Sequence, residues 1–456
     1  MLPRWMSVGC DRHGGHGRGG KRSGSDVDLT VSDQLSLSDR VRRCVLYLPS
    51  NNEHRRGRFT PFRFVSFLMT CAFLTCHSQA ANPASEVTNV GPVMRELCGK
   101  SVALIGESPV HGFGKTLEFK VELVRRLIDD CHYNAVLFES GIYDFLNIQE
   151  QVKSGHAVTD SMIAAAIGGL WANQEVQPLV PFLREKVTRD QVYLGGLDDQ
   201  LGRGTWAQKQ MPSALAAFLP GDDRARCLAI LEKHLLWQYT SGAPYGPQDK
   251  ARILDCLDRM KAQPSGTSSP ARADDLAIID SLERQFDRDF QSVPAGMDAD
   301  TLWTNERDRS MYLNFRWLLS QLPRHSKVIV WAATVHVAKQ LSAVPGDQSR
   351  IPLGFYIHRE FKSRAFALGF SAYSGSYARV GQPVRPLHPA PQGSLEGRLI
   401  ADVDGDIVYL SRSELRKSGP IAARPLGADF TTARWNQVLD GIVIFRREHA
   451  PEYLPH

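Results

Sequence analysis

Short apolar runs alternate with longer stretches of helical periodicity over most of this chain. This alternation is typical of strands joined by helices and predicts a mostly parallel α/β sheet. We read four runs as strands, and two weaker runs near the carboxyl terminus in the same way. The six expected strands are Val102–Ile105, Ala135–Phe138, Val192–Gly195, Lys327–Trp331, Ala365–Phe370 and Gly441–Phe445.

The stretch that follows the first expected strand has a clear helical pattern. Val121, Val124 and Ile128 share one face of this expected helix, while Lys120 lies on another face. A polar face of this kind usually meets solvent. We therefore expect an amphipathic helix that returns from the first strand to the second.

The strand pattern disappears in the middle of the chain. Between about residues 206 and 297 only helical segments remain, and a loop rich in Pro, Ser and Gly separates them at 263–275. We therefore expect one α/β domain over residues 82–456, with a helical insertion at about 206–297.

Residues 1–81 have the features of an export leader. Basic residues precede an apolar stretch, Phe64–Cys76, and small or polar residues follow as far as Ala80 and Ala81. These are the three parts of a secretory signal peptide, and the stretch is shorter than the roughly 20 residues of a membrane span. We expect a disordered leader and signal peptide, an over-extended start, no stable membrane anchor and an exported, periplasmic or secreted protein. The alternative is a buried helix of the domain.

The composition is that of an ordinary soluble enzyme, with 43% hydrophobic residues and a net charge of +5. The positive excess lies before residue 65, so the rest of the chain is near neutral. A domain without a basic surface gives no reason to expect a nucleic-acid partner.

Four cysteines remain beyond the leader, an even number that suits an oxidising compartment. Cys98 precedes the first strand and Cys131 ends the returning helix, so a bridge at the amino edge of the sheet is plausible. Cys227 and Cys256 lie on two helical segments that can pack as a hairpin. Four buried free thiols are the alternative.

Polar residues follow the ends of the expected strands. In an open parallel sheet, ligands bind beyond the carboxyl ends of the strands, so these side chains define a candidate site. They are Glu107 and His111 after the first strand, Glu139 after the second, Asp198 and Asp199 after the third, and His336 after the fourth.

Two familiar motifs are present only in part. Gly114-Lys115-Thr116 opens a helix as in a phosphate-binding P-loop, but Pro109 stands where the motif has its first Gly. Ser108 follows a strand as in a nucleophile elbow, with Asp198 and His336 later in the chain, but the closing Gly is absent.

A third interpretation needs no nucleophilic side chain. Glu107 and His111 flank one loop, so the carboxylate can orient the imidazole and raise its basicity. His111 then deprotonates a water molecule that attacks an ester carbonyl. Glu139 and His336 position that water or polarise the carbonyl.

The order of these residues resembles the erythromycin esterase family, from about Ser101 to the end of the chain. In that family a strand leads to Gly-Glu-x-x-His-Gly and a long helix, and later strands end in a Glu, in Gly-x-Asp-x-Gln and in Trp-Ala-His-Asn-x-His. The matching residues are Gly106, Glu107, His111 and Gly112 with Glu118 and Phe119; Glu139; Trp171, Glu175 and Val176; Gly196, Asp198 and Gln200; Arg307, Asp308 and Met311; and Trp331, Ala332 and His336.

The resemblance implies a three-layer α/β/α fold with a mostly parallel sheet and a helical insertion over a deep cleft. It also implies hydrolysis of a small-molecule ester, a macrolide lactone in the family, with the loop histidine acting on water and no cofactor.

The chain departs from the family pattern at three places. One extra residue separates Glu107 from His111, and the loop after His111 is longer. Ala333 and Thr334 stand where the family has His-Asn, so only His336 remains at that strand end. These departures keep open another ester or amide substrate, and a non-catalytic relative that only binds its ligand.

Further roles remain open. Glu107, His111, Glu139 and His336 include ligand types for one divalent ion, so a metal-dependent hydrolase of the same fold is an alternative.

Trp171 and Glu175, four residues apart on an expected helix, and Asp198 are candidates for substrate binding. Core packing and a surface ion pair are the structural alternatives for Trp171 and Glu175. We interpret Arg307 and Asp308 as a structural ion pair.

Overall fold

The computed structural model describes residues 90–263, 270–401 and 405–455. In these residues an eight-stranded sheet has the order β3-β2-β4-β1-β5-β10-β7, with β6 paired to β5. The mutually parallel strands are β1 (Val102–Ile105), β2 (Ala135–Gly141), β3 (Tyr193–Asp198), β4 (Val328–Trp331), β5 (Ala365–Tyr377) and β10 (Gly441–Glu448). The antiparallel additions are β6 (Arg385–Leu387) and β7 (Ile407–Ser411).

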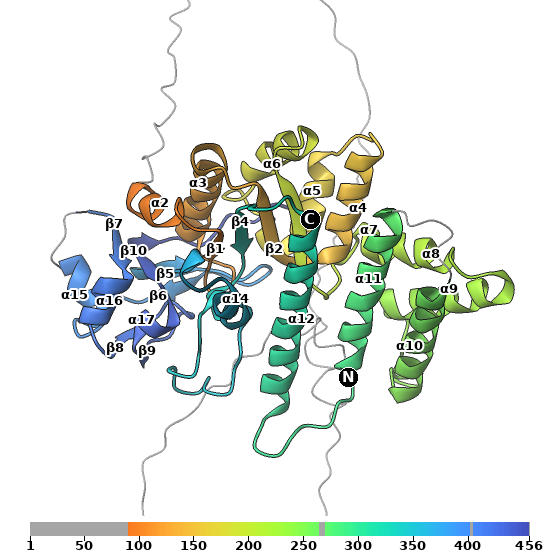
Figure 1. The fold of residues 1–456 in the computed structure, drawn as a ribbon. Helices are drawn as coiled ribbons and strands as arrows, with labels where there is room; N and C mark the ends of the chain where they lie inside the picture. Colours follow the sequence, from red (N-terminus) through yellow and green to blue (C-terminus); the bar gives the residue numbers. More distant parts are fainter. Residues whose placement is uncertain (1–89, 264–269, 402–404, 456) are drawn as a thin grey trace, which may run out of the picture. The chain divides into compact units, whose positions relative to one another are not determined.

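Helices cover both faces of this sheet. One face carries α2 (Gly91–Leu97), α3 (Gly114–Cys131), α5 (Asp160–Ile167) and α6 (Leu179–Thr188). The other carries α8 (Met211–Ala216), α9 (Gly221–Leu235), α10 (Pro247–Ala262), α11 (Pro270–Asp287), α12 (Ala299–Gln321) and α14 (Leu353–Phe361). Figure 1 shows α8 to α10 at one end of the molecule and β7 at the other.

Further helices, two 3₁₀ turns and a hairpin complete the described chain. They are α4 (Ile142–Lys153), the 3₁₀ turn η2 (Gly169–Trp171), α7 (Trp206–Lys209), α13 (Thr334–Val337), η3 (Lys362–Arg364), α15 (Leu395–Ala401), α16 (Arg412–Lys417), α17 (Trp435–Val438), and the small hairpin of β8 (Ile421–Ala423) and β9 (Thr431–Ala433).

The strands alternate their side chains between two hydrophobic cores, one on each face. Val102 and Leu104 of β1 pack with the α8–α12 layer, and Ala103 and Ile105 pack with the α3 layer. Because successive strand residues point to opposite faces, strands that are apolar at every position have to be covered on both sides. This requirement gives the three layers that the family resemblance implied.

The register brings the strand ends to one level. Ile105 of β1 and Phe138 of β2 both pair with Trp331 of β4. Glu107, two residues beyond Ile105, and Glu139, next after Phe138 within β2, therefore lie on either side of β4 at the carboxyl edge of the sheet. The fold thus assembles the edge that the sequence indicated.

All six expected strands are present, but several are longer than expected, and β3 begins one residue later and ends at Asp198. Helices α7 to α11 occupy most of the expected insertion, and α11 begins inside the stretch expected to be a loop. The leader predicted at residues 1–81 lies outside the described residues, and so do 264–269 of the expected loop. No helix in the described ranges is long and apolar enough to cross a membrane.

Both cysteine pairs form disulfides, Cys98 with Cys131 and Cys227 with Cys256. The first joins the segment before β1 to the end of α3, and the second joins α9 to α10. The alternative of four free thiols is therefore wrong for this structure.

The Cys227–Cys256 bridge should stabilise the helical insertion. We expect the Cys227→Ala/Cys256→Ala protein to lose roughly 2–4 kcal/mol of unfolding free energy, because the bridge restricts the unfolded chain. Urea unfolding measures the loss, and the parent treated with reductant should fall at least to the level of the oxidised variant, because reductant also breaks the Cys98–Cys131 bridge. An unchanged unfolding midpoint in both experiments would count against the bridge.

Candidate active site

The loop after β1 brings a carboxylate against an imidazole. His111 Nδ1 lies 2.8 Å from Glu107 Oε1, although one extra residue separates them compared with the family pattern. The same oxygen accepts the indole N–H of Trp171 at 2.7 Å. The His111 ring also meets the Trp171 ring edge-on, at 5.1 Å between centroids.

A buried cation keeps Glu107 charged. Burial alone would raise the pKa of Glu107, but the Lys120 ammonium, with Nζ 3.0 Å from Oε2, and His111 lower it below its ordinary value. Lys120 is itself fully buried, its Nζ lies 4.1 Å from the Trp331 ring centroid, and burial lowers its pKa to about 8 despite the opposing attraction of Glu107.

The charge of Glu107 fixes the tautomer of His111. A carboxylate has no proton to donate, so His111 Nδ1 must carry the hydrogen between them. The lone pair of the ring then lies on Nε2, for which no hydrogen-bond partner is found in the described part of the chain. A neutral imidazole held in this way can accept a proton at Nε2.

The backbone holds His111 in a costly conformation. Its φ of +52° lies in the left-handed region, which few residues other than Gly adopt, although Asn, Asp and His do so more often than the rest. Gly112 packs against the carbonyl of Ala378 so closely that a Cβ would overlap it, and its own carbonyl accepts the Ala378 N–H at 3.1 Å. Strain that persists because the surroundings enforce it is often found at functional sites.

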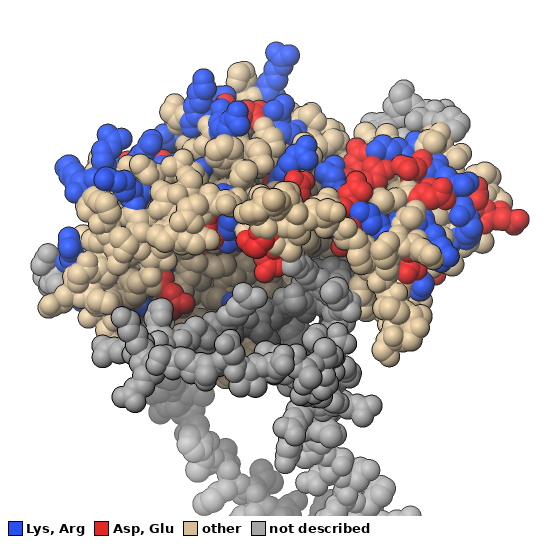
Figure 2. Space-filling model, turned by 90° about the horizontal axis from the view of Figure 1, so that it is seen from below, with Lys and Arg blue, Asp and Glu red and all other residues tan. Residues whose placement is uncertain are grey.

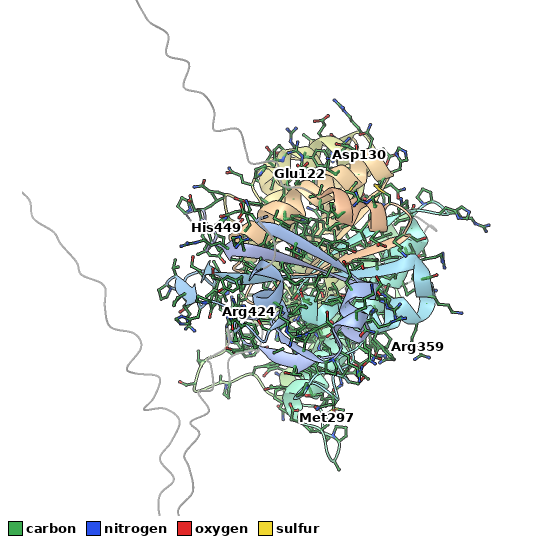
Figure 3. The ribbon with its side chains drawn as sticks, turned by 90° about the vertical axis from the view of Figure 1, so that its left-hand side faces the viewer. Glu122, Asp130, Met297, Arg359, Arg424 and His449 are labelled. Carbon is green, nitrogen blue, oxygen red and sulfur yellow. A yellow bond between two sulfur atoms is a disulfide. The ribbon has the colours of Figure 1, made fainter. Side chains whose placement is uncertain are left out.

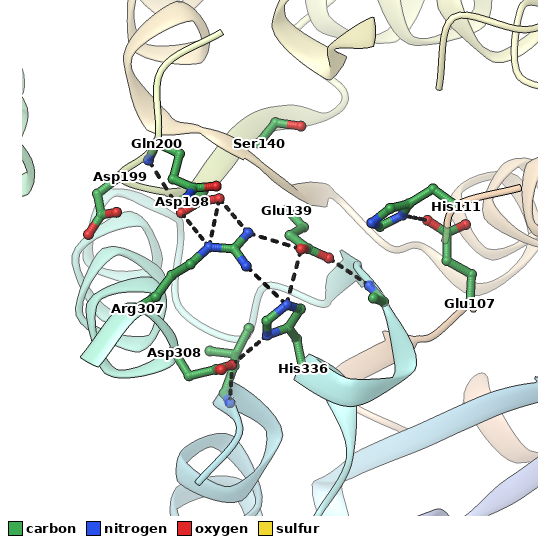
Figure 4. A network of polar contacts seen from close by, with 12 residues as sticks. Glu107, His111, Glu139, Ser140, Asp198, Asp199, Gln200, Arg307, Asp308 and His336 are labelled. Atoms are coloured by element: carbon green, nitrogen blue, oxygen red, sulfur yellow. Dashed lines mark hydrogen bonds and ion pairs between the residues drawn. The ribbon is translucent and has the colours of Figure 1, made fainter. Parts of the chain in front are cut away.

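A second cluster lies beyond Glu139 (Figure 4). The Arg307 guanidinium bonds Asp198 with Nε at 3.1 Å and Nη2 at 2.6 Å, and Nη2 also reaches Glu139 at 3.0 Å. Glu139 Oε2 accepts the backbone N–H of Ala333 at 2.7 Å. Arg307 thus neutralises carboxylates from the ends of β2 and β3 together.

His336 completes this cluster. Its Nδ1 lies 2.8 Å from Asp308 Oδ1, and its Nε2 lies 3.2 Å from Glu139 Oε1. Burial alone would lower the pKa of His336, but Asp308 and Glu139 raise it to about 9. Burial would raise the pKa of Glu139, yet His336 and Arg307 hold it well below its ordinary value. His336 is therefore a cation near neutral pH.

Two expectations about how residues pair or pack are wrong. Trp171 ends η2 and Glu175 lies beyond it, so the two do not share a helix face; Glu175 accepts the Glu452 N–H instead. Arg307 and Asp308 do not pair with each other but with the partners given above.

Asp198, a candidate for substrate binding, forms an ion pair with Arg307, and its role towards a substrate stays a prediction. Its neighbour Asp199 pairs with Arg288.

The two partial motifs are not assembled. Within the described ranges Ser108 Oγ is buried without a hydrogen-bond partner, and His336 faces Asp308 rather than Asp198, so these three residues do not form a Ser-His-Asp triad. At the start of α3, the carboxylate of Glu448 accepts the N–H groups of Lys115 at 2.9 Å and Thr116 at 3.1 Å. The chain's own carboxyl group therefore takes the place that a phosphate would need.

The residues also do not fit the metal alternative. The Glu107 carboxylate is already bonded to Lys120 and Trp171, and the Glu139 carboxylate is already bonded to Arg307. No group of three His, Cys, Asp or Glu side chains in the described ranges is arranged to hold a metal ion.

Sequence reasoning did not place Lys120 or Glu448 in the site, and it named Asp308 without its partner His336. Lys120 carried a readable signal, because it lies three residues from both Leu117 and Leu123 on the buried side of α3. Asp308 and Glu448 carried none, since their partners His336 and Thr116 are remote in sequence.

Comparison with known proteins identifies the family. The sequence model of the Erythromycin esterase family matches residues 128–447, so this chain belongs to that family. The match begins within α3, after His111, and the role of the loop therefore depends on its geometry.

A protein of Bacillus subtilis (strain 168) named Putative hydrolase YbfO is 23% identical over 338 residues, which are 67% of this chain and 73% of that protein. Membership of the family and this relative make the chain a hydrolase of the erythromycin esterase family.

Solved structures agree on the fold. A crystal structure of a succinoglycan biosynthesis protein has a TM-score of 0.61 at 13% identity and covers 80% of this chain and 92% of its own. A mutant of the erythromycin esterase EreC in its open conformation has a TM-score of 0.56 at 14% identity and covers 79% of this chain and 94% of its own.

The charge on His336 should make stability depend on pH. Its folded pKa of about 9 lies above the unfolded value of about 6.5, so its contribution is complete below pH 6.5 and is lost as the pH rises through 9. We expect the difference in unfolding free energy between the parent and His336→Gln to shrink by roughly 1–3 kcal/mol from pH 6 to pH 9.5. Urea titrations at both pH values measure it, and a constant difference would contradict the assignment.

Proposed function

We propose that this hydrolase cleaves a carboxylic ester or lactone with a water molecule activated by His111. The observation that carries the proposal is the pairing of His111 Nδ1 with a charged, buried Glu107, which leaves Nε2 as the proton acceptor. A macrolide lactone is the substrate class to test first, because the solved relative EreC is an erythromycin esterase.

The proposed reaction has two stages. His111 Nε2 takes a proton from water as the water oxygen attacks the ester carbonyl carbon, and negative charge develops on the carbonyl oxygen. When the tetrahedral intermediate collapses, His111 returns the proton to the leaving alkoxide, giving an acid and an alcohol. Arg307 and His336 balance the nearby carboxylates of Glu139, Asp198 and Asp308, so these acids oppose that negative charge less.

The proposed mechanism requires no metal ion. The Lys120 ammonium and the Arg307 guanidinium already supply the positive charge against Glu107 and Glu139. Trp171 is proposed to act through Glu107, whose orientation its indole N–H fixes.

Ala333 supports a second candidate function. The family has a histidine at this strand end, whereas here the position offers only its backbone N–H to Glu139. A relative that binds the ligand without turnover is therefore the alternative, and tight binding without product at any pH would favour it.

The decisive experiment incubates the protein with a 14-membered macrolide and a panel of simple esters, with and without chelator. Mass spectrometry detects addition of one water, and we expect hydrolysis that survives chelation. We expect His111→Ala to reduce turnover by about 10²–10⁴-fold. Its thermal midpoint should change little, because Lys120 and Trp171 still satisfy Glu107.

His156→Ala is the matched control, since His156 is exposed in the loop after α4. It should keep full turnover. Equal activity in His111→Ala, or activity that chelation removes, would overturn the mechanism; no product from any compound would leave binding as the function.

We also propose export, supported by two disulfides and by the signal-like stretch that includes Phe64–Cys76. Expression in a bacterium with a periplasm should yield protein that begins near Ala81 or Asn82 in the periplasmic or secreted fraction. Amino-terminal sequencing of each fraction checks this. Cytoplasmic protein that retains residues 1–81 and free thiols would contradict it.

A further inference from the structure

A second concave site lies at the opposite edge of the sheet from Glu107. A cavity of about 690 Å³ opens beside the first residues of β5, with Phe366 in its lining and Phe355 of α14 on its wall. Ala365, the first residue of β5, pairs with Val102 at the start of β1, whereas Glu107 follows the end of β1. The volume is in the range of small-molecule pockets, roughly 300–1,000 Å³.

Basic side chains from separate segments converge on this cavity. Lys100 comes from the segment before β1, Arg359 from α14, Lys362 from the turn after it, and Arg412 from the start of α16. Figure 3 shows Arg359 at the surface on the other side of the molecule from His449, which follows β10. Figure 2 shows Lys and Arg with few acidic neighbours at the end that carries β7, whereas both signs mix over α9 and α10.

The acid at the base of the cavity is already neutralised. Asp440 accepts from Lys339 at 2.6 Å, from His358 at 3.0 Å and from the backbone N–H of Ala367 at 3.0 Å. The Lys339 ammonium donates two further hydrogen bonds, both to backbone carbonyls. Among the four rim cations, all in the described residues, only the half-exposed Arg412 lies near this acid, with its Nε 3.7 Å from Asp440 Oδ1.

The positive charge of the rim is therefore mostly not balanced by acids of the cavity. Glu96 is the other acid of the lining, so Lys100, Arg359, Lys362 and Arg412 outnumber it by three. In the described residues neither Arg359 nor Lys362 lies within 4 Å of a carboxylate. Arg359 instead lies 5.5 Å from the Phe355 ring centroid, where it borders an apolar wall.

Lys362 is held in a backbone conformation that suits glycine. Its φ of +51° and ψ of −125° are sparsely populated by residues with a Cβ. Folding alone gives no reason for a long, charged side chain there. A residue kept at a strained position on the wall of a cavity points to a use for its cation.

We propose that this cavity binds a small organic phosphate whose remaining part is apolar or aromatic. Two arginines and two lysines match the double negative charge and the oxygens of a phosphate group, because guanidinium groups bond such groups in pairs. Phe355 and Phe366 offer apolar surface for the rest of the ligand. The site is separate from the His111 loop and does not depend on the proposed hydrolysis.

Titration calorimetry with phenyl phosphate tests the proposal on the full chain at 0.15 M chloride. Phenyl phosphate should bind saturably at one site, inorganic phosphate more weakly, and phenol not at all. Arg359→Gln/Lys362→Gln should weaken binding of phenyl phosphate at least tenfold. Arg126→Gln/Arg189→Gln removes the same charge from exposed residues elsewhere and should bind like the parent.

Two further variants separate recognition from folding. Lys362→Gly should weaken binding while the thermal midpoint stays the same or rises, because glycine adopts this backbone without strain. His111→Ala should bind phenyl phosphate like the parent. Absence of saturable binding, equal loss in the two double variants, or full binding by Arg359→Gln/Lys362→Gln would overturn the proposal.

Discussion

The structure depends on keeping Glu107 charged inside the protein. An isolated buried carboxylate costs several kcal/mol, and this one is compensated by the buried amine of Lys120 together with the N–H groups of Trp171 and His111. Because Lys120 belongs to α3 and Trp171 to η2, the ion pair also fixes how those segments meet the end of β1. The orientation of His111 follows from that arrangement.

A similar constraint governs the neighbouring strand ends. Glu139 and Asp198 emerge from β2 and β3 into the interior, where two carboxylates would repel each other. Arg307 of α12 lies between them, and Asp308, the next residue, holds His336. The long helix that follows the insertion thus supplies the positive charge that lets the carboxyl edge hold several acids.

Much of the fold could be predicted, because apolar runs report strands that are buried on both faces, and the ends of parallel strands meet at one edge. The pairing of Glu107 with His111 was also within reach, since both flank one loop. The sequence could not show which residue pairs with each charged side chain of the site. Trp171 was placed on a helix that does not form, and Asp308 binds a histidine whose position depends on tertiary packing.

The missing histidine at position 333 changes less than its absence suggests. Glu139 is held there by a backbone N–H, which any residue except proline supplies, so this contact does not need a histidine at position 333. His336 remains, but its pKa of about 9 keeps it protonated near neutral pH, so it has no lone pair with which to accept a further proton. In the proposed mechanism the work of accepting a proton therefore falls to His111 alone, whose Nδ1 is committed to Glu107 and whose Nε2 is free to react.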